Sequence, residues 1–246
     1  MSSPPKKFII LETVDSTNNY AMGLVQNDLA ESGDAVFAME QTAGKGRRGK
    51  NWESNKGQNV VLTVISDMKW LPVFSQFQLS VAVSMACHDF FTAYTKTEIK
   101  IKWPNDIFMN DRKAGGILIE NVLQGNLWQW AIIGIGLNIN QEEFESSNSN
   151  AISLKQMTHK SYDAVSVSKE LHENVLDKIA SLKNGGYSKM LSAYNSNLFA
   201  KNKKVKLRKG NITFETTIER VSSNGELVTK DAIERTFGFD AIEWIW

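Results

Sequence analysis

The sequence has few of the residues that build disulfides and zinc sites. Of its 246 residues, one is cysteine and three are histidine. A disulfide within the chain is therefore impossible, and no Cys-x-x-Cys or His-x-x-x-His spacing predicts a zinc site. The cysteine, Cys87, lies in the apolar stretch from Phe77 to Phe91. We therefore expect a buried helix residue there, not a nucleophile.

The sequence also lacks a long apolar run and an excess of either charge. Near the N-terminus the apolar run extends from Phe8 to Leu11, too short for a secretion signal or a membrane span. Lys and Arg number 28 and Asp and Glu 27, so the net charge is +1. Such a balance creates no global field toward nucleic acid or membrane. We expect a cytoplasmic globular protein that binds neither DNA nor membrane.

The hydrophobic pattern predicts an α+β fold with two domains. Strands are expected at 8–12, 35–41 and 59–66, hairpins over 98–140, and helices at 20–25, 73–94, 162–182 and 187–199. The segment from about Lys201 onward is short, β-rich and punctuated by turns, which suits a small SH3-like barrel. The sequence therefore predicts a main domain over residues 1–199 and a small one over residues 200–246.

The stretch QTAGKGRRGKNWES (41–54), called here the basic loop, is the most informative segment. Glycines and cations alternate in it: Gly44, Lys45, Gly46, Arg47, Arg48, Gly49 and Lys50. Its G-x-G-x-x-G spacing is not a dinucleotide fingerprint, because a strand and not a helix follows. A kinase loop is excluded because the His-Arg-Asp and Asp-Phe-Gly motifs are missing. The loop is either a solvated basic segment or a cover that closes over phosphates.

A second polar cluster, KWPND, follows the expected strand IKIK. Pro104 favours an extended Trp103 and ends strand pairing, so Lys102, Asn105 and Asp106 project at a bend between two strands. Lysine can neutralise a phosphate, asparagine can donate and accept hydrogen bonds, and aspartate can hold Mg²⁺. The alternative is an ordinary turn, which leaves Lys102 and Trp103 unexplained.

Two further segments place glycine where a strand is expected. Lys113 stands beside Gly115 and Gly116, which indicates either a ligand anion that approaches Lys113 or a β-bulge with an exposed lysine. In GIGLNIN (134–140), alternation directs the branched residues to the core. The opposite face would carry Gly134, Gly136, Asn138 and Asn140. That face would be a floor almost free of side chains, on which a planar ligand can rest.

These segments stand in the order found in one known family. STNNYAM, QTAGKGRRGK with a following Trp, KWPNDI, RKAGGILIE and GIGLNIN resemble the signature segments of biotin–protein ligases. The resemblance implies a biotin- and ATP-binding catalytic domain over residues 1–199, with a mixed sheet like that of class II synthetases. It also implies an SH3-like C-terminal domain over residues 200–246. Many members carry an N-terminal winged-helix domain that binds DNA, but STNN begins here at residue 16, so we expect no repressor function.

The resemblance implies a role for individual residues. The catalytic residues would be Arg47, Lys113, Lys102 and Asp106. Biotin would be bound by Ser16, Thr17, Asn18, Gln41, Gly44, Lys45, Arg47, Lys113 and Gly116. ATP would be bound by Arg47, Arg48, Gly49, Lys50, Trp52, Lys102, Asn105, Asp106 and Asn138, with Asp106 as the candidate ligand of Mg²⁺. Lys45 and Lys50 stand where arginine is common in the family, and lysine lacks the bidentate fork of arginine.

The resemblance also implies two chemical steps. Biotin and ATP would form biotinyl-5′-AMP and pyrophosphate. A lysine of the biotin carboxyl carrier protein domain of a carboxylase would then attack the acyl carbon and release AMP. The ligase would act as a monomer or a homodimer.

Two other functions remain open at this point. A lipoate–protein ligase is similar in fold and chemistry, although KWPND beside GKGRRGK favours biotin. A nucleic-acid-binding module would use the basic loop and the segment KNKKVKLRK (201–209), in which six of nine residues are cations. That segment could instead be an edge strand protected by charge, or a docking face for an acidic carrier.

Overall fold

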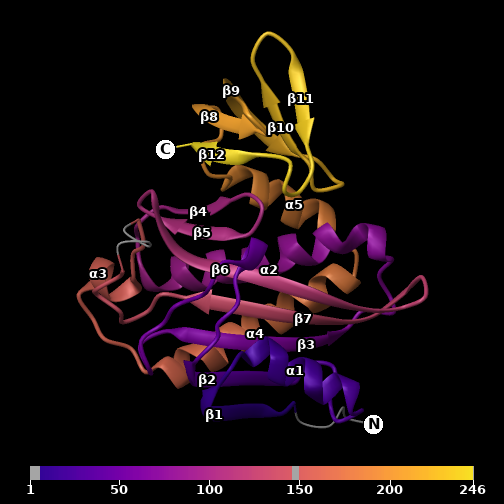
Figure 1. Ribbon diagram of the computed structural model, residues 1–246, viewed down its shortest axis with the longest axis vertical. Helices are drawn as coiled ribbons and strands as arrows, with labels where there is room; N and C mark the ends of the chain where they lie inside the picture. Colours follow the sequence, from indigo (N-terminus) through magenta and orange to yellow (C-terminus); the bar gives the residue numbers. More distant parts are fainter. Residues whose placement is uncertain (1–5, 146–149, 246) are drawn as a thin grey trace.

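The computed structural model describes residues 6–145 and 150–245 and contains two β-sheets (Figure 1). The larger, seven-stranded sheet has the order β1-β2-β3-β7-β6-β5-β4. Strands β1 and β2 pair in parallel and the other neighbours pair antiparallel, so the sheet is mixed. Its strands are β1 (Phe8–Val14), β2 (Ala35–Gln41), β3 (Val60–Asp67), β4 (Ile99–Lys102), β5 (Asp106–Met109), β6 (Arg112–Gln124) and β7 (Leu127–Leu137).

The helices connect and cover this sheet. They are α1 (Thr17–Gln26), α2 (Gln76–Tyr94), α3 (Leu154–Thr158), α4 (Ala164–Lys183) and α5 (Tyr187–Ser196). Two single turns of 3₁₀ helix, η1 (Arg47–Gly49) and η2 (Val73–Ser75), lie in the basic loop and before α2. Helix α3 was not predicted from the sequence. It is a short helix held by a capping box between Ser153 and Gln156, which can begin a helix without a long apolar stripe.

Alternation along the central strands creates two apolar faces on the large sheet. On one face Val36, Ile65 and Ile132 pack in a small cluster with α1. On the other, Phe37 and Ile133 belong to the larger core that α2 and α4 complete. Because successive side chains of a strand point to opposite faces, α1 lies on one side of the sheet and α2 and α4 on the other, as Figure 1 shows.

Helix α2 contributes more buried residues to this core than any other helix of the described chain. Its apolar residues include Leu79, Val83, Phe90 and Phe91, none of which has any exposed surface. Each such side chain contributes roughly 1.5–3 kcal/mol when fully buried. Cys87 is also fully buried there, and burial raises the pKa of its thiol well above the usual range. The expectation of a buried helix cysteine is confirmed.

The smaller sheet is built by the C-terminal segment and stands above the large one in Figure 1. Its order is β11-β10-β9-β8-β12. The strands are β8 (Lys204–Lys209), β9 (Ile212–Val221), β10 (Leu227–Lys230), β11 (Glu234–Phe237) and β12 (Glu243–Ile245). The β-rich segment expected after Lys201 is therefore present. The exact domain boundary between residues 199 and 200 stays a proposal.

The alternative in which KNKKVKLRK forms an edge strand is wrong. Strand β8 pairs with β9 on one side and with β12 on the other, so its backbone groups are bonded in both directions. The sequence could not reveal this because β12 is only three residues long and follows β8 after a long interval. The lysines of β8 thus belong to an inner strand. At least one of them, Lys204, forms an ion pair with Glu215 at 2.7 Å. Within residues 6–145 and 150–245, no helix is both long enough and apolar enough to cross a bilayer.

Candidate functional site

A cavity opens on the face of the large sheet that carries α1. On this face Gly134 and Gly136 of β7 continue the row that begins with the buried Ile132, so the apolar packing stops where the side chains stop. Gly116 of β6 lies directly opposite Gly136 in the strand pairing. Three glycines on two neighbouring strands therefore form the expected floor, and we call this space the glycine-floored cavity.

The floor is shorter than the sequence pattern predicts. Strand β7 ends at Leu137, and the side chains of the next two asparagines hold other segments in place. The Asn138 amide donates to the carbonyl oxygens of Lys113 and Ile152, and the Asn140 amide donates to that of Tyr162. These two residues hydrogen-bond to backbone groups beyond the end of the floor.

The neutral side chains of Thr17, Asn18 and Gln41 line one end of the cavity. The Gln41 side-chain oxygen accepts from the backbone N–H and the hydroxyl of Thr17, at 2.8 and 3.0 Å. The hydroxyl of Thr63 on β3 lies 2.8 Å from the Thr17 hydroxyl and 2.7 Å from the Asn18 amide oxygen. The Asn18 amide nitrogen donates to Glu120 at 2.7 Å. Because these residues are buried or half-buried and mutually bonded, this end is preorganised before any ligand arrives.

Charged groups line the other end. Lys113 Nζ lies 2.8 Å from Asp106 Oδ1, and a guanidinium nitrogen of Arg47 donates to Asn105 Oδ1 at 3.3 Å. The Asn105 amide also donates to the carbonyl oxygen of Ile117, which fixes its orientation. The β5–β6 pairing shifts register beside Lys113, as expected of a β-bulge, and Lys113 also lines the cavity. The approach of a ligand anion to Lys113 stays a prediction.

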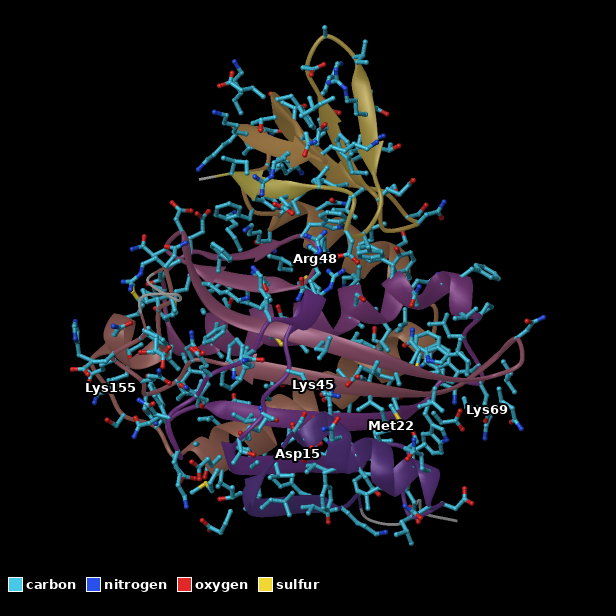
Figure 2. All side chains as sticks on the ribbon, viewed as in Figure 1. Asp15, Met22, Lys45, Arg48, Lys69 and Lys155 are labelled. Carbon is cyan, nitrogen blue, oxygen red and sulfur yellow. The ribbon has the colours of Figure 1, made fainter. Side chains whose placement is uncertain are left out.

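The basic loop folds as a tight hairpin over the cavity. Lys45 and Asn51 form a bridge, and the Gly46 N–H donates to the Lys50 carbonyl oxygen at 2.7 Å. A Cβ atom at Gly44 would lie 2.3 Å from the carbonyl oxygen of Trp52, so a side chain there would force the two arms apart. In Figure 2, Lys45 lies over the large sheet, whereas Arg48 lies higher, where the loop reaches the C-terminal sheet.

The Trp52 ring rests on the glycine floor. A Cβ atom at Gly136 would lie 2.3 Å from Trp52 Cε2, which is closer than any real contact. The indole N–H of Trp52 is buried and has no hydrogen-bond partner among residues 6–145 and 150–245. A buried donor without an acceptor costs free energy, so this N–H is a candidate group for contact with a ligand.

Lys102 lies beside the cavity and not in its lining. Its amine is about equally distant from two aromatic rings, 5.2 Å from the centroid of Phe108 and 5.1 Å from that of Trp244 in β12. Burial lowers the pKa of Lys102 to about 8, while the nearby Asp106 carboxylate acts in the opposite direction. A lysine in this position has a weakened preference for its charged form.

The cavity brings together most of the residues predicted from the sequence. Its lining includes Ser16, Thr17, Asn18, Gln41, Lys45, Arg47, Trp52, Asn105, Asp106, Lys113 and Gly116. The predicted residues outside this lining are Gly44, Arg48, Gly49, Lys50, Lys102 and Asn138. Gly44, Gly49 and Lys50 shape the loop, and Arg48 points to the C-terminal sheet, where it bonds Asp240. The individual roles stay predictions.

Sequence reasoning missed two polar residues that hydrogen-bond to the cavity lining, Thr63 and Glu120. Thr63 is fully buried in the middle of the mainly apolar strand VVLTVIS, and a hydroxyl at that place was the available signal. Glu120 faces the same side as Gly116 on β6 and bonds Asn18. Its signal was weaker, because a glutamate near the end of a strand is common on solvated faces.

A metal ion would find few protein ligands in this cavity. No group of three or more His, Cys, Asp or Glu residues able to hold a metal ion occurs in the described part of the chain. Among the described residues that line the cavity, Asp106 supplies the one carboxylate, and it is paired with Lys113. A metal ion here would therefore take most of its ligands from a bound molecule or water.

Comparison with solved structures identifies the fold. The biotin protein ligase from Aquifex aeolicus in complex with biotin and ATP matches with a TM-score of 0.82 at 23% identity, over 97% of this chain and 98% of that one. The biotin protein ligase from Leishmania major in complex with biotinyl-5-AMP matches with a TM-score of 0.63 at 25% identity, over 95% and 99%. The mixed α+β fold is thus confirmed, and the C-terminal sheet is consistent with an SH3-like domain.

Comparison with curated sequences and family models identifies the relatives. The bifunctional ligase/repressor BirA of Escherichia coli is 34% identical over 140 residues, 56% of this chain and 42% of that protein. The biotin–[acetyl-CoA-carboxylase] ligase of Paracoccus denitrificans is 35% identical over 133 residues, 53% of each. The matched region spans about half the length of these relatives. The model of the biotin/lipoate A/B protein ligase family matches residues 10–138, more than half of the chain, and the chain therefore belongs to that family.

Proposed function

We propose that this protein is a biotin–protein ligase, which uses ATP to activate biotin and transfers it to a lysine of a carrier protein. One observation carries the proposal: a single cavity with a glycine floor joins a hydrogen-bonding end, at Thr17 and Gln41, to an end that carries the cations Arg47 and Lys113. Biotin has matching parts, a neutral ureido ring at one end and a carboxylate at the other. The relatives named as biotin ligases support biotin over lipoate.

In the proposed first step, the biotin carboxylate attacks the α-phosphorus of ATP, and pyrophosphate leaves. Two anions must meet, so the reaction needs cations at the meeting point. Arg47 and Lys113 are the candidates. An ion pair at about 4 Å is worth roughly 4 kcal/mol at an effective dielectric constant of about 20, against about 0–1 kcal/mol on an open surface. The cations of the basic loop can therefore stabilise the reacting anions strongly only if the loop excludes water from the cavity.

In the proposed second step, the amine of a carrier lysine attacks the acyl carbon of biotinyl-5′-AMP. The C–N bond forms, AMP leaves with the electrons of the C–O bond, and the amine loses a proton. We propose the biotin carboxyl carrier domain of a carboxylase as the acceptor. Mg²⁺ would enter with ATP, and Asp106 is the carboxylate available to it in the cavity.

The test is transfer to a carrier. The protein is incubated with MgATP, a biotin carrier domain and either biotin or lipoate, and the carrier mass is measured. We expect the carrier to gain one biotinyl group, with little or no lipoyl product. A carrier whose acceptor lysine is replaced by arginine should gain nothing. Transfer of lipoate in preference to biotin would move the protein to the other branch of its family, and transfer of neither would refute the proposal.

A further inference from the structure

The C-terminal sheet contacts the basic loop through one carboxylate. Asp240, in the segment between β11 and β12, accepts hydrogen bonds on Oδ1 from a terminal nitrogen of Arg47 and from Nε of Arg48, both at 2.8 Å. Arg48 also donates to the carbonyl oxygen of Ile242 at 3.5 Å. Two successive arginines of the loop are thus held by a residue that lies more than 190 positions later in the chain.

The neighbour of Asp240 strengthens the same contact. The Arg47 guanidinium carbon lies 5.7 Å from the centroid of the Phe239 ring. Phe239 also stacks on Trp103, with centroids 5.7 Å apart and an angle of 9° between the planes. The Trp103 indole N–H donates to the Gly225 carbonyl oxygen at 2.9 Å. Arg47 therefore rests on an aromatic ring that is itself fixed against the main domain.

Backbone conformation points to the same conclusion. Arg48 has φ 57° and ψ 37°, in the left-handed region that arginine rarely adopts. Such a conformation persists where surrounding contacts hold it. The described contacts of the Arg48 side chain are all with the C-terminal segment, at Asp240 and Ile242. Asp240 itself has φ 66°, which aspartate and asparagine tolerate better than most residues.

We propose that Asp240 is a positioning residue, through which the C-terminal sheet holds the basic loop and keeps Arg47 at the mouth of the glycine-floored cavity. The part of this inference that concerns the loop rests on geometry alone. The part that concerns biotinyl-5′-AMP rests on the proposed function. Both partners are partly exposed, at 54% for Asp240 and 41% for Arg48, so the contact should weaken as salt is added.

The decisive variant is Asp240→Asn. Asparagine keeps the size of the side chain and tolerates the left-handed backbone, so the change removes the charge and little else. The basic loop contains four trypsin sites, and cleavage there can be followed by mass spectrometry without any ligand. We expect cleavage within the loop to become about threefold to tenfold faster in the variant at low salt, as for loss of partly exposed ion pairs. At about 1 M salt the variant and the wild type should converge, because the pairs are screened.

The matched control is Asp231→Asn. Asp231 lies in the turn between β10 and β11 and pairs with Arg235 of the same sheet. The substitution therefore removes an ion pair that does not contact the basic loop. We expect wild-type cleavage of the loop in this variant. If the Asp240→Asn loop is cut at the wild-type rate, or if both variants are cut equally fast, the proposed contact is refuted.

A second readout tests positioning. If Asp240 positions Arg47, biotinyl-5′-AMP should dissociate from Asp240→Asn several-fold faster, while the melting temperature stays close to that of the wild type. Faster loop cleavage with unchanged adenylate dissociation would overturn the positioning role. A wild-type protein that forms no adenylate would refute the proposed function, and the cleavage comparison would still decide whether Asp240 holds the loop.

Discussion

At the scale of single residues, Lys113 pairs with the cavity's carboxylate, with its Nζ 2.8 Å from Asp106 Oδ1. The variant Lys113→Ala removes positive charge from the place where the biotin carboxylate and the α-phosphate would meet. We expect pyrophosphate release from biotin and ATP to fall by roughly 100-fold or more. Lys155→Ala is the control, because it breaks an ion pair with Glu142. Lys155 is labelled in Figure 2 and lies at the edge of the molecule. Near-normal release by Lys113→Ala would remove Lys113 from the mechanism.

Lys102 leads to a prediction about pH. Its pKa in the folded protein is about 8, below the usual 10.5 of the unfolded chain, mainly because of burial. Between these values the unfolded chain binds more protons, so this residue makes the free energy of unfolding rise with pH. Below pH 8 both states are charged and the cost of the buried charge is fully present. Lys102→Met should therefore stabilise the protein at pH 7 by roughly 1–3 kcal/mol, less than the shift alone implies because the rings of Phe108 and Trp244 favour the cation.

Denaturant unfolding at several pH values checks this. The advantage of Lys102→Met should shrink as the pH rises from 8 toward 10.5. Lys100→Met is the matched control, because Lys100 lies on the same strand and pairs at 2.9 Å with the exposed Glu98. A stabilisation of Lys102→Met that is the same at pH 7 and pH 10 would show that lost charge is not its cause.

At the scale of elements, much of the fold was predictable because periodicity is local. Strand β2 occupies the predicted residues 35–41, and the hairpins of β4–β7 fall within the predicted 98–140. The sequence also predicted the loop, the KWPND bend and the glycine floor, since each depends on residues close together in the chain. It did not predict which strand neighbours which. Strand β3 pairs with β7, about 70 residues later, and no local pattern in either strand specifies that partner.

Side-chain contacts between elements were equally hidden. The pairing of Asp240 with Arg47 joins residues 193 positions apart, and a lone aspartate in a turn gives no signal of it. Asn138 shows the opposite case. Its place after the glycines suggested a side chain on the ligand face, but its amide bonds two backbone carbonyl groups. A buried amide needs such partners, and where they lie depends on the packed structure.

Strand β7 supplies a prediction at this scale. Gly136→Ala would place a methyl group 2.3 Å from Trp52 Cε2, so the indole ring must leave its position on the floor. We expect a folded protein that binds biotin and ATP at least about tenfold more weakly, a loss of about 1.4 kcal/mol. Gly23→Ala on α1 is the control, because its new methyl group meets nothing within 4 Å. It should leave binding unchanged and stabilise the helix by roughly 0.5–1 kcal/mol. Unchanged binding by Gly136→Ala in titration calorimetry would contradict this account of the floor.

At the scale of the whole molecule, the KWPND bend joins the two sheets. Trp103 follows β4 of the large sheet and is 3% exposed. Its ring stacks on Phe239 and its N–H binds the Gly225 carbonyl oxygen, so both of these contacts belong to the C-terminal segment. Gly225 in turn packs against Phe77 of α2, where a Cβ atom would lie 2.5 Å from the ring. The bend thus shapes the cavity and fixes the C-terminal sheet that holds the loop.

This arrangement predicts how the molecule unfolds. With Trp103 in place, the two sheets should unfold together in one calorimetric transition, because separating them exposes a large buried ring. Trp103→Ala removes that ring at a cost of roughly 3–5 kcal/mol, and the loss falls on the contact between the sheets. We expect two transitions, with the C-terminal sheet unfolding at the lower temperature. Ile233→Ala, which shortens a side chain that is 58% exposed in the turn between β10 and β11, should keep one transition. If Trp103→Ala shows a single transition at a lower temperature, the remaining contacts suffice to couple the two sheets. Trp103 would then stabilise the molecule without joining its two sheets.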